Sequence, residues 1–370
     1  MPTKRVCQKV PKRLVVPAER QIFEGKVTVH FGGYGSAMAF NSEDSTFWLL
    51  TDRGPNVDGV TSVSKVFVYP DYIPCIGVFK WQRDSLFLLR KILLKDQNGS
   101  CFNGLPNVFG NGMTGETAYD TGGNVIPNTQ KRGLDPEGLA LAPDGSFWIS
   151  DEYGPYLIHF NAQGEWLEEL SPFNGRMPVH YAKRRPNRGM EGLCMNTSGS
   201  RLYGILQAPL DSIEGALSLF ADHLPLFVYS LTDSTWNEYA YPLDNGENGV
   251  SELCFVNDST LWVLERDGSF PDEKGKSCKL IYEIILPVTS SKDIVRLKKT
   301  RVLDIVEAIP GYSHDKAEGI CFINDTTFCV VNDDDFGINS PERADGSVVP
   351  KLNAYDQLDV NVIYIIPCHR

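Results

Sequence analysis

A pair of short apolar segments recurs along this chain of 370 residues, and the repeat constrains the fold more than any other feature. In each pair, a polar turn separates a first run from a second run that is rich in aromatic or β-branched residues. Such a pair predicts an antiparallel hairpin, and self-similarity along a whole chain predicts a repeat architecture. The first runs are Gly35–Phe40, Asp135–Leu141, Met190–Met195, Val250–Phe255 and Lys316–Phe322, and the second runs are Thr46–Leu50, Ser146–Ile149, Arg201–Leu206, Thr260–Leu264 and Thr327–Val331.

Further apolar runs follow most of these hairpins. Third runs occur at Tyr156–Phe160, Leu226–Ser230, Leu280–Ile285 and Val362–Ile366, and fourth runs at Trp166–Leu170, Glu238–Pro242 and Arg301–Ile305. Four short antiparallel strands per repeat are typical of a β-propeller blade. We therefore predict an all-β fold, a single β-propeller with five blades. A sixth, degenerate blade is the alternative, because 101 residues separate Ser36 from Glu137.

The last unit lacks a fourth strand of its own. Arg13–Pro17 and Arg20–Phe23 have the pattern to supply it, and closure by the N-terminal strand would remove an exposed sheet edge. No linker divides the chain, so we predict one domain over residues 1–370. Within it, residues 96–133 are rich in Gly and Asn and predict an insertion loop, and residues 210–224 predict a short helical insertion.

Composition narrows the range of partners. The net charge is −12, which argues against binding to nucleic acid or to an anionic membrane, and it allows a cation site. No apolar run is long enough to predict a membrane span, and the basic N-terminus has no apolar segment that would predict a signal peptide. Three cysteines, Cys194, Cys254 and Cys321, occupy the same place in the repeat and are predicted to be buried.

The repeat also predicts where charged residues gather. In an antiparallel hairpin, the start of the first strand lies beside the end of the second strand, and charged residues occur at both places. Blades around one axis would bring these ends together at one channel mouth. The predicted set comprises Asp135, Glu137, Glu191, Glu252 and Glu318 from the first strands, and Asp52, Arg53, Asp151, Glu152, Glu265, Arg266 and Asp333–Asp335 from the ends of the second strands.

Crowded carboxylates need counter-charges. Two such groups at ~4 Å repel each other by about 4 kcal/mol at an effective dielectric constant of about 20. Arg53, Arg188, Arg266 and Lys316 offset part of this repulsion, and a bound divalent cation, above all Ca²⁺, would offset the rest. The alternative interpretation is structural, because propellers also use Asp and Glu in hydrogen bonds between blades.

The charged motifs resemble those of a known family, called esterase-like activity of phytase. The resemblance runs from about residue 25 to residue 366, and the motifs that carry it are Thr51–Asn56, Leu134–Leu139, Trp148–Tyr153, Pro186–Gly192, Leu264–Asp267, Ala317–Ile320 and Asn332–Phe336. It implies a fold similar in outline to calcium-dependent β-propeller phytases, phosphoester hydrolysis, and export from the cytoplasm. Two repeats depart from the pattern, at Leu206–Pro209 and at Ser251–Leu253.

With this resemblance, the first functional hypothesis is a metal-assisted, calcium-dependent hydrolase of phosphate esters that acts at the channel mouth. The predicted metal ligands are Asp52, Glu137, Asp151, Glu191, Glu252 and Glu318. Phosphate oxygens would be bound by Arg53, Arg188, Arg266 and Lys316. Either Glu152 or Asp334 is predicted to act as the base, and the spacing does not choose between them.

Two other functions use the same fold. In the first, Ca²⁺ polarises the carbonyl of a lactone or carboxylic ester, and in the second, the propeller binds a ligand or protein without catalysis. The expected partner is a small, anionic substrate, and no nucleic acid or membrane span is expected. For localisation, the resemblance favours a periplasmic or secreted protein.

Overall fold

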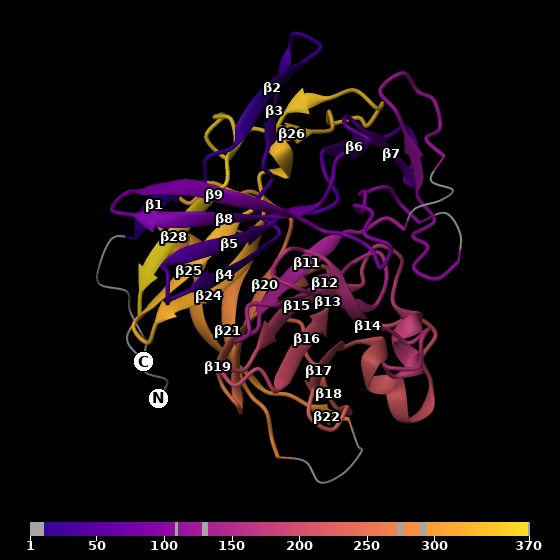
Figure 1. Cartoon of the computed structure of the whole chain (residues 1–370), viewed down its shortest axis with the longest axis vertical. Helices are drawn as coiled ribbons and strands as arrows, with labels where there is room; N and C mark the ends of the chain where they lie inside the picture. The colour runs from indigo at the N-terminus through magenta and orange to yellow at the C-terminus, as the bar shows by residue number, and fades with distance from the viewer. Residues whose placement is uncertain (1–10, 108–109, 128–131, 272–276, 289–293, 369–370) are drawn as a thin grey trace.

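The computed structural model describes residues 11–107, 110–127, 132–271, 277–288 and 294–368, and five antiparallel sheets dominate it (Figure 1). The first sheet contains β4 (Ala37–Asn41), β5 (Thr46–Leu50), β8 (Cys75–Gln82) and β9 (Ser85–Leu93), and the second contains β11 (Pro136–Leu141), β12 (Phe147–Asp151), β13 (Tyr156–Phe160) and β14 (Trp166–Leu170). The third contains β15 (Met190–Met195), β16 (Arg201–Leu206), β17 (Leu224–Ser230), β18 (Thr235–Tyr241) and the short β22 (Val295–Arg296), which pairs parallel with β18. The fourth contains β19 (Gly249–Asn257), β20 (Thr260–Arg266), β21 (Lys279–Ile285) and β23 (Lys299–Asp304), and the fifth contains β24 (Ala317–Asn324), β25 (Thr327–Asn332), β28 (Val362–Pro367) and β1 (Lys12–Val15). All five predicted hairpins are present, which confirms the all-β prediction.

The N-terminal segment completes the fifth sheet. Strand β1 pairs antiparallel with β28, and Leu14 lies opposite Ile363. This confirms the prediction for Arg13–Pro17. The prediction for Arg20–Phe23 is wrong, because β2 (Glu19–Phe23) leaves the sheet and forms a separate hairpin with β3 (Val27–Phe31).

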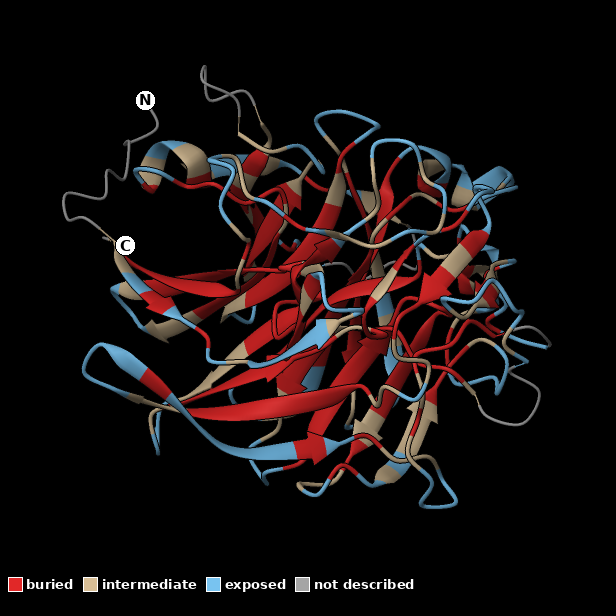
Figure 2. Ribbon diagram, turned by 90° about the horizontal axis from the view of Figure 1, so that it is seen from above, coloured by how far each residue is buried: buried red, intermediate tan, exposed pale blue. Residues whose placement is uncertain are grey.

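The apolar core is divided among the junctions between sheets. Five clusters of buried side chains each join residues from two neighbouring sheets, and one of them joins the fifth sheet to the first. The aromatic residues of the second strands lie inside these clusters, including Trp48, Trp148 and Trp262. The first strands β4, β11, β15, β19 and β24 contact one another in that order, and β24 contacts β4. Each sheet is therefore held on both sides, and Figure 2 shows buried strands surrounded by exposed loops.

A β-bulge interrupts the first hairpin register at the same place in four sheets. The shifts fall between Pro136 and Gly138, Met190 and Leu193, Val250 and Glu252, and Ala317 and Gly319. A bulge changes the direction of the side chain that it leaves unpaired. In three sheets, the motif glutamate lies in the bulge, so the bulge sets the direction in which that carboxylate points.

The glycine after each of these glutamates permits close contact between sheets. A Cβ atom on Gly192 would lie 2.5 Å from the backbone nitrogen of Leu253 on the next sheet, and one on Gly138 would lie 2.4 Å from the backbone oxygen of Glu191. At Gly319, the distance to the backbone nitrogen of Met38 would be 2.9 Å. The Glu-Gly motif thus combines a redirected carboxylate with a backbone contact that only glycine allows.

A second, smaller group of strands stands at one end of the five sheets (Figure 1). We call it the crown: the hairpin β2–β3, the hairpin of β26 (Ile338–Asn339) and β27 (Val349–Pro350), and the sheet of β6 (Asn56–Asp58), β7 (Ser64–Phe67) and β10 (Thr117–Tyr119). Its core contains Val29, Val57, Val66, Phe336 and Ile338. Apart from Arg20–Phe23, which was assigned to another sheet, the sequence patterns did not predict these strands, because most of them have only two to five residues.

The predicted insertions contain little regular structure. Within residues 96–133, of which 108–109 and 128–131 are outside the described part, strand β10 pairs with β7. Within residues 210–224, the structure has a 3₁₀ helix, η2 (Gly215–Ala221). The other helices are η1 (Val179–Lys183), α1 (Ile305–Ala308) and η3 (Asp335–Gly337). No helix in the described ranges is long and apolar enough to cross a membrane.

The glycine contacts predict a stability effect. Gly192→Ala should lower the free energy of unfolding by about 1–3 kcal/mol, because the added methyl group would push β15 away from β19. Gly246→Ala is the matched control, because nothing lies within 4 Å of its Cβ position. Thermal unfolding of both variants checks this, and equal melting temperatures would contradict the role given to Gly192.

Candidate functional site

The hairpin register places charged residues at one rim of the sheets. Pro136 at the start of β11 lies opposite Asp151 at the end of β12, and Ala317 at the start of β24 lies opposite Asn332 at the end of β25. In the fourth sheet, Gly249 lies opposite Arg266. Since the first strands contact one another around a ring, these rims meet, and residues that are far apart in sequence come together there.

Three carboxylates form the densest part of this rim. Asp135, Glu137 and Glu152 each offer one oxygen atom, and these atoms all lie within 4.8 Å of one another. Asp135 and Glu152 are buried, and Glu137 is half-buried. Glu137 accepts a hydrogen bond of 2.8 Å from the hydroxyl of Ser36 on the first sheet. Residues of two sheets therefore hold this acidic triad in place.

Further charged residues interact electrostatically with the triad. Asp52 and Glu191 both act on Glu137, and Arg188 acts on Glu152. Glu191 in turn is affected by Glu318 and Arg266. We define the mouth as this connected set: Asp52, Asp135, Glu137, Glu152, Glu191 and Glu318, with Arg53, Arg188, Arg266 and Lys316.

Burial makes the charged forms of the mouth carboxylates costly. It raises the pKa of Asp52 to about 7, and the nearby Asp135 adds to this shift. Burial also raises the pKa of Glu137, Glu152 and Glu191 well above their usual range, and neighbouring carboxylates contribute in the same direction. Each of these groups would be stabilised in its ionised form by an added cation.

Three of the four predicted substrate-binding cations are already paired. Arg53 is buried and donates to Glu116 at 2.9 Å, and its Nε lies 3.6 Å from Asp135. Arg266 donates twice to Glu318.

Lys316, the third of them, donates to Asp335 at 2.5 Å. Arg188 is exposed, and within the described part of the chain no ion pair joins it to a carboxylate. Arg188 is therefore the cation best placed to bind an incoming anion.

Three predicted site residues do not enter the mouth. Asp151 is fully buried and accepts hydrogen bonds from the backbone of Asp135 and Tyr153, so it shapes the loop that carries the triad. Its pKa is raised to about 7 by burial. Asp334 is buried against the crown, where it bonds to His30 at 2.9 Å.

Glu252 is displaced by one position in the repeat. The register leaves Ser251 in the bulge and pairs Glu252 with Leu264, so Glu252 occupies the place that glycine has in the other repeats. Its Oε1 accepts hydrogen bonds from the backbone nitrogens of Leu193 at 3.0 Å and Leu253 at 2.9 Å. Its side chain therefore lies between strands, which also explains why the repeat lacks the following glycine.

Three residues in or beside the mouth were given no role in binding or catalysis from the sequence. Asp135 was predicted to converge there but was not assigned as a ligand, although it directly precedes the Pro-Glu-Gly motif. Glu116 belongs to the insertion and carried no strand pattern that could place it. Gln207 donates to Glu191 at 2.7 Å at the position where other repeats have an acid or base.

The mouth has the donor set that a hard divalent cation prefers. Ca²⁺ binds carboxylate oxygens in a flexible geometry, and the triad offers three of them close together. Besides these atoms, Glu191 has a buried Oε2 for which the described residues supply no hydrogen-bond partner. The residues present therefore fit a divalent cation at Asp135, Glu137 and Glu152, with Glu191 nearby.

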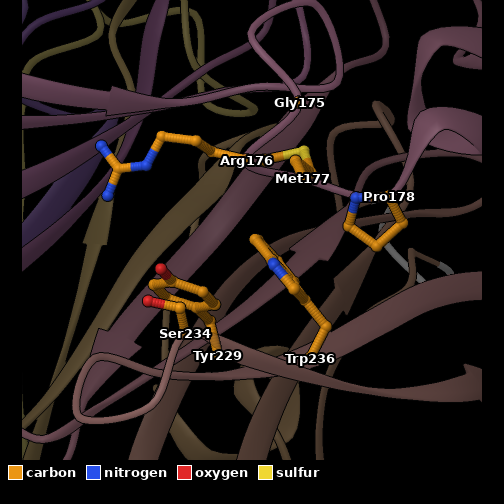
Figure 3. Close-up of a pocket in the computed structure, with 7 residues that line it drawn as sticks. All are labelled: Gly175, Arg176, Met177, Pro178, Tyr229, Ser234 and Trp236. Carbon is orange, nitrogen blue, oxygen red and sulfur yellow. The ribbon is translucent and has the colours of Figure 1, made fainter.

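A separate cavity has a volume of about 480 Å³ and lies away from the mouth. Figure 3 shows the residues that line it. It is lined by Gly175, Arg176, Met177, Pro178, Tyr229, Ser234 and Trp236. Tyr229 pairs with Leu202 near the start of β16, whereas the mouth lies at the end of that strand. The cavity has no carboxylate in its lining, so it lacks the features of the mouth.

The chain belongs to the family described as esterase-like activity of phytase, which matches residues 29–336. This confirms the resemblance seen in the motifs. A relative from Arthroderma benhamiae, described as an uncharacterized secreted protein, is 27% identical over 354 aligned positions, covering 78% of this chain and 67% of the relative.

Among solved structures, similarity is low. A luciferin-regenerating enzyme has a TM-score of 0.40 and 12% identity, covering 96% of this chain and 95% of that one. Virginiamycin B lyase from Staphylococcus aureus has a TM-score of 0.38 and 10% identity, covering 98% and 97%.

The raised pKa values predict how stability depends on pH without metal. A carboxyl group whose pKa is raised on folding binds more protons in the folded protein than in the unfolded chain, so stability falls as pH rises toward the raised pKa. With chelator present, the melting temperature should fall from about pH 5 to about pH 8. Glu137→Gln removes one such group and should flatten this fall. A melting temperature that rises over this range would contradict the assignment.

Proposed function

We infer that the five sheets are the blades of a five-bladed β-propeller closed by the N-terminal strand, with the mouth at one end of its axis. The cyclic contacts of the first strands and the five apolar clusters between sheets support this description. In this description, residues 1–370 form one domain, residues 96–133 are an insertion that contributes Glu116, and the crown forms one side of the mouth.

We propose that the protein is a calcium-dependent hydrolase of phosphate esters. The observation that carries the proposal is the carboxylate triad of Asp135, Glu137 and Glu152 with the exposed Arg188 beside it. Family membership supports hydrolysis. The secreted relative supports an extracytoplasmic location, where Ca²⁺ is abundant relative to the cytosol.

The residues of the mouth would have different roles in the binding of the cation and of the substrate. Asp135 and Glu137 would hold the cation, with Asp52, Glu191 and Glu318 adding negative charge around it. When bound, the cation would neutralise the substrate phosphate and lower the pKa of the attacking water. Arg188 would bind a phosphate oxygen and orient the ester.

Glu152 is the better candidate for the base. Burial and the neighbouring Asp135 raise the pKa of Glu152, so this carboxylate is a stronger base than an exposed one. No described residue donates a hydrogen bond to its carboxylate, so it could accept a proton from water. Asp334 is held by His30 and by the backbone of Phe336, and we do not assign it this role.

One observation favours a carboxylic ester or lactone as the alternative substrate. Arg53, Arg266 and Lys316 already neutralise carboxylates, so, among the residues that the structure describes, Arg188 is the one cation of the mouth left for a dianionic phosphate. A neutral ester needs fewer cations, because the metal alone can polarise its carbonyl.

The triad can be tested by isosteric substitution. Glu152→Gln should lower metal-dependent phosphate release by about 100-fold or more, because it removes the base. Glu307→Gln changes an exposed glutamate on α1 and should leave activity unchanged. The assay compares metal-stripped protein with and without Ca²⁺ on phosphomonoesters, phosphodiesters and lactones. No turnover of any substrate with any metal would contradict the proposal.

Arg188 predicts a separate effect on substrate binding. Arg188→Ala should raise KM for phosphate esters about tenfold, because one charge-assisted hydrogen bond is lost. Arg185→Ala is the control, because Arg185 lies in the same turn but pairs with Asp211 at 3.0 Å. A selective increase for phosphate esters and not for lactones would assign Arg188 to the phosphate, and equal KM values in both variants would exclude that role.

A further inference from the structure

The outer strand of the first sheet exposes a continuous run of apolar and basic residues. Strand β9 is paired with β8 on one side and forms the sheet edge on the other. Residues 87–91 are all exposed, and the exposed fractions reach 52% for Phe87 and 58% for Leu89. Edge strands of soluble proteins usually avoid such apolar exposure, so this run requires an explanation.

Two other strands extend this surface. Strand β1 contacts β9 (Figure 1). Lys12 on β1 forms an ion pair with Asp84 at 2.7 Å. Strand β2 is linked to β9 by the pair of Lys91 and Glu19 at 3.8 Å. Val15 on β1 and Ile22 on β2 are exposed at 54% and 70%. We call the exposed residues of β1, β2, β9 and the turn before β9 the basic flank.

The local charge of the flank differs from that of the whole protein. Its exposed basic residues are Arg13, Arg20, Arg83, Arg90 and Lys91, and its acids are Glu19 and Asp84. Both acids are paired with lysines. Within the described ranges, no ion pair joins any of the four arginines to a carboxylate. A chain of net charge −12 therefore carries a basic, apolar face, which the average charge does not reveal.

We propose that the basic flank docks on the surface of an anionic lipid bilayer. Apolar side chains that enter the headgroup region and basic side chains that attract anionic lipids are the two terms that bind a protein to such an interface. A second copy of the chain fits less well, because it would bring together arginines of both copies whose charge no carboxylate of the described residues neutralises. Residues 87–91 of β9 are all exposed, which suits a fluid layer that can surround this part of the strand.

Vesicle binding tests the proposal. The probes are phosphatidylcholine vesicles with and without phosphatidylserine, sedimented with the full chain at low and high salt. Binding is expected only with phosphatidylserine, and it should weaken as salt rises. Arg90→Glu with Lys91→Glu should reduce binding about tenfold or more, since each basic residue near the surface contributes. Phe87→Ser with Leu89→Ser should also reduce vesicle binding, because it removes apolar side chains that would enter the headgroup region and leaves the charge of the flank unchanged.

Matched controls separate docking from folding. Leu167→Ser changes an exposed leucine on the edge strand β14, and Arg301→Glu changes an exposed arginine on the edge strand β23. Both should bind like the unchanged protein. Circular dichroism verifies folding, and Arg20→Glu with Ile22→Ser on β2 gives a second test if the β9 variants fail to fold. The proposal is overturned if the protein binds no vesicle, if phosphatidylserine makes no difference, or if the flank variants bind normally. It is also overturned if the protein binds polyglutamate, an acidic polymer without lipid, but does not bind vesicles.

Discussion

Close contact between the first strands of neighbouring sheets is the constraint on which the candidate site depends. At Gly138, Gly192 and Gly319, the backbone of one sheet lies so near its neighbour that a methyl group would collide with backbone atoms. The same positions carry β-bulges, which set the direction of the preceding glutamates. Packing and chemistry are therefore specified by the same two residues of the repeat. This explains why carboxylates separated by tens of residues in sequence meet at one rim.

Charge balance gives the mouth its chemical character. Most of its basic side chains already form ion pairs with carboxylates, since Arg266 pairs with Glu318 and Lys316 pairs with Asp335. Lys351 also binds Asp335 at 2.6 Å, and together with Lys316 it holds the pKa of that carboxyl well below its usual range. Within the described residues no ion pair reaches Glu137 or Glu152 of the triad, and their pKa values remain raised. The rim thus has one region that is internally neutralised and another that requires an added cation.

Sequence reasoning located the rim but not every residue in it. Hairpin geometry was sufficient to place Glu137, Glu191 and Glu318, because strand ends follow directly from the apolar pattern. It placed Glu252 one position wrongly, since a bulge shifts the register by a residue and aligned glutamates then occupy different sites. Glu116 and the crown could not be placed, because their positions depend on long-range pairings such as β10 with β7. The composition likewise concealed the basic flank, because net charge averages over all faces.

The most direct measurement is anomalous scattering from crystals grown with Ca²⁺ and soaked with a heavier divalent or lanthanide ion. If the redirected carboxylates create a cation site, one strong peak will lie between the oxygen atoms of Asp135, Glu137 and Glu152. It will be absent in crystals of Glu137→Gln. Peaks confined to surface carboxylates elsewhere, with none at the triad, would contradict the account.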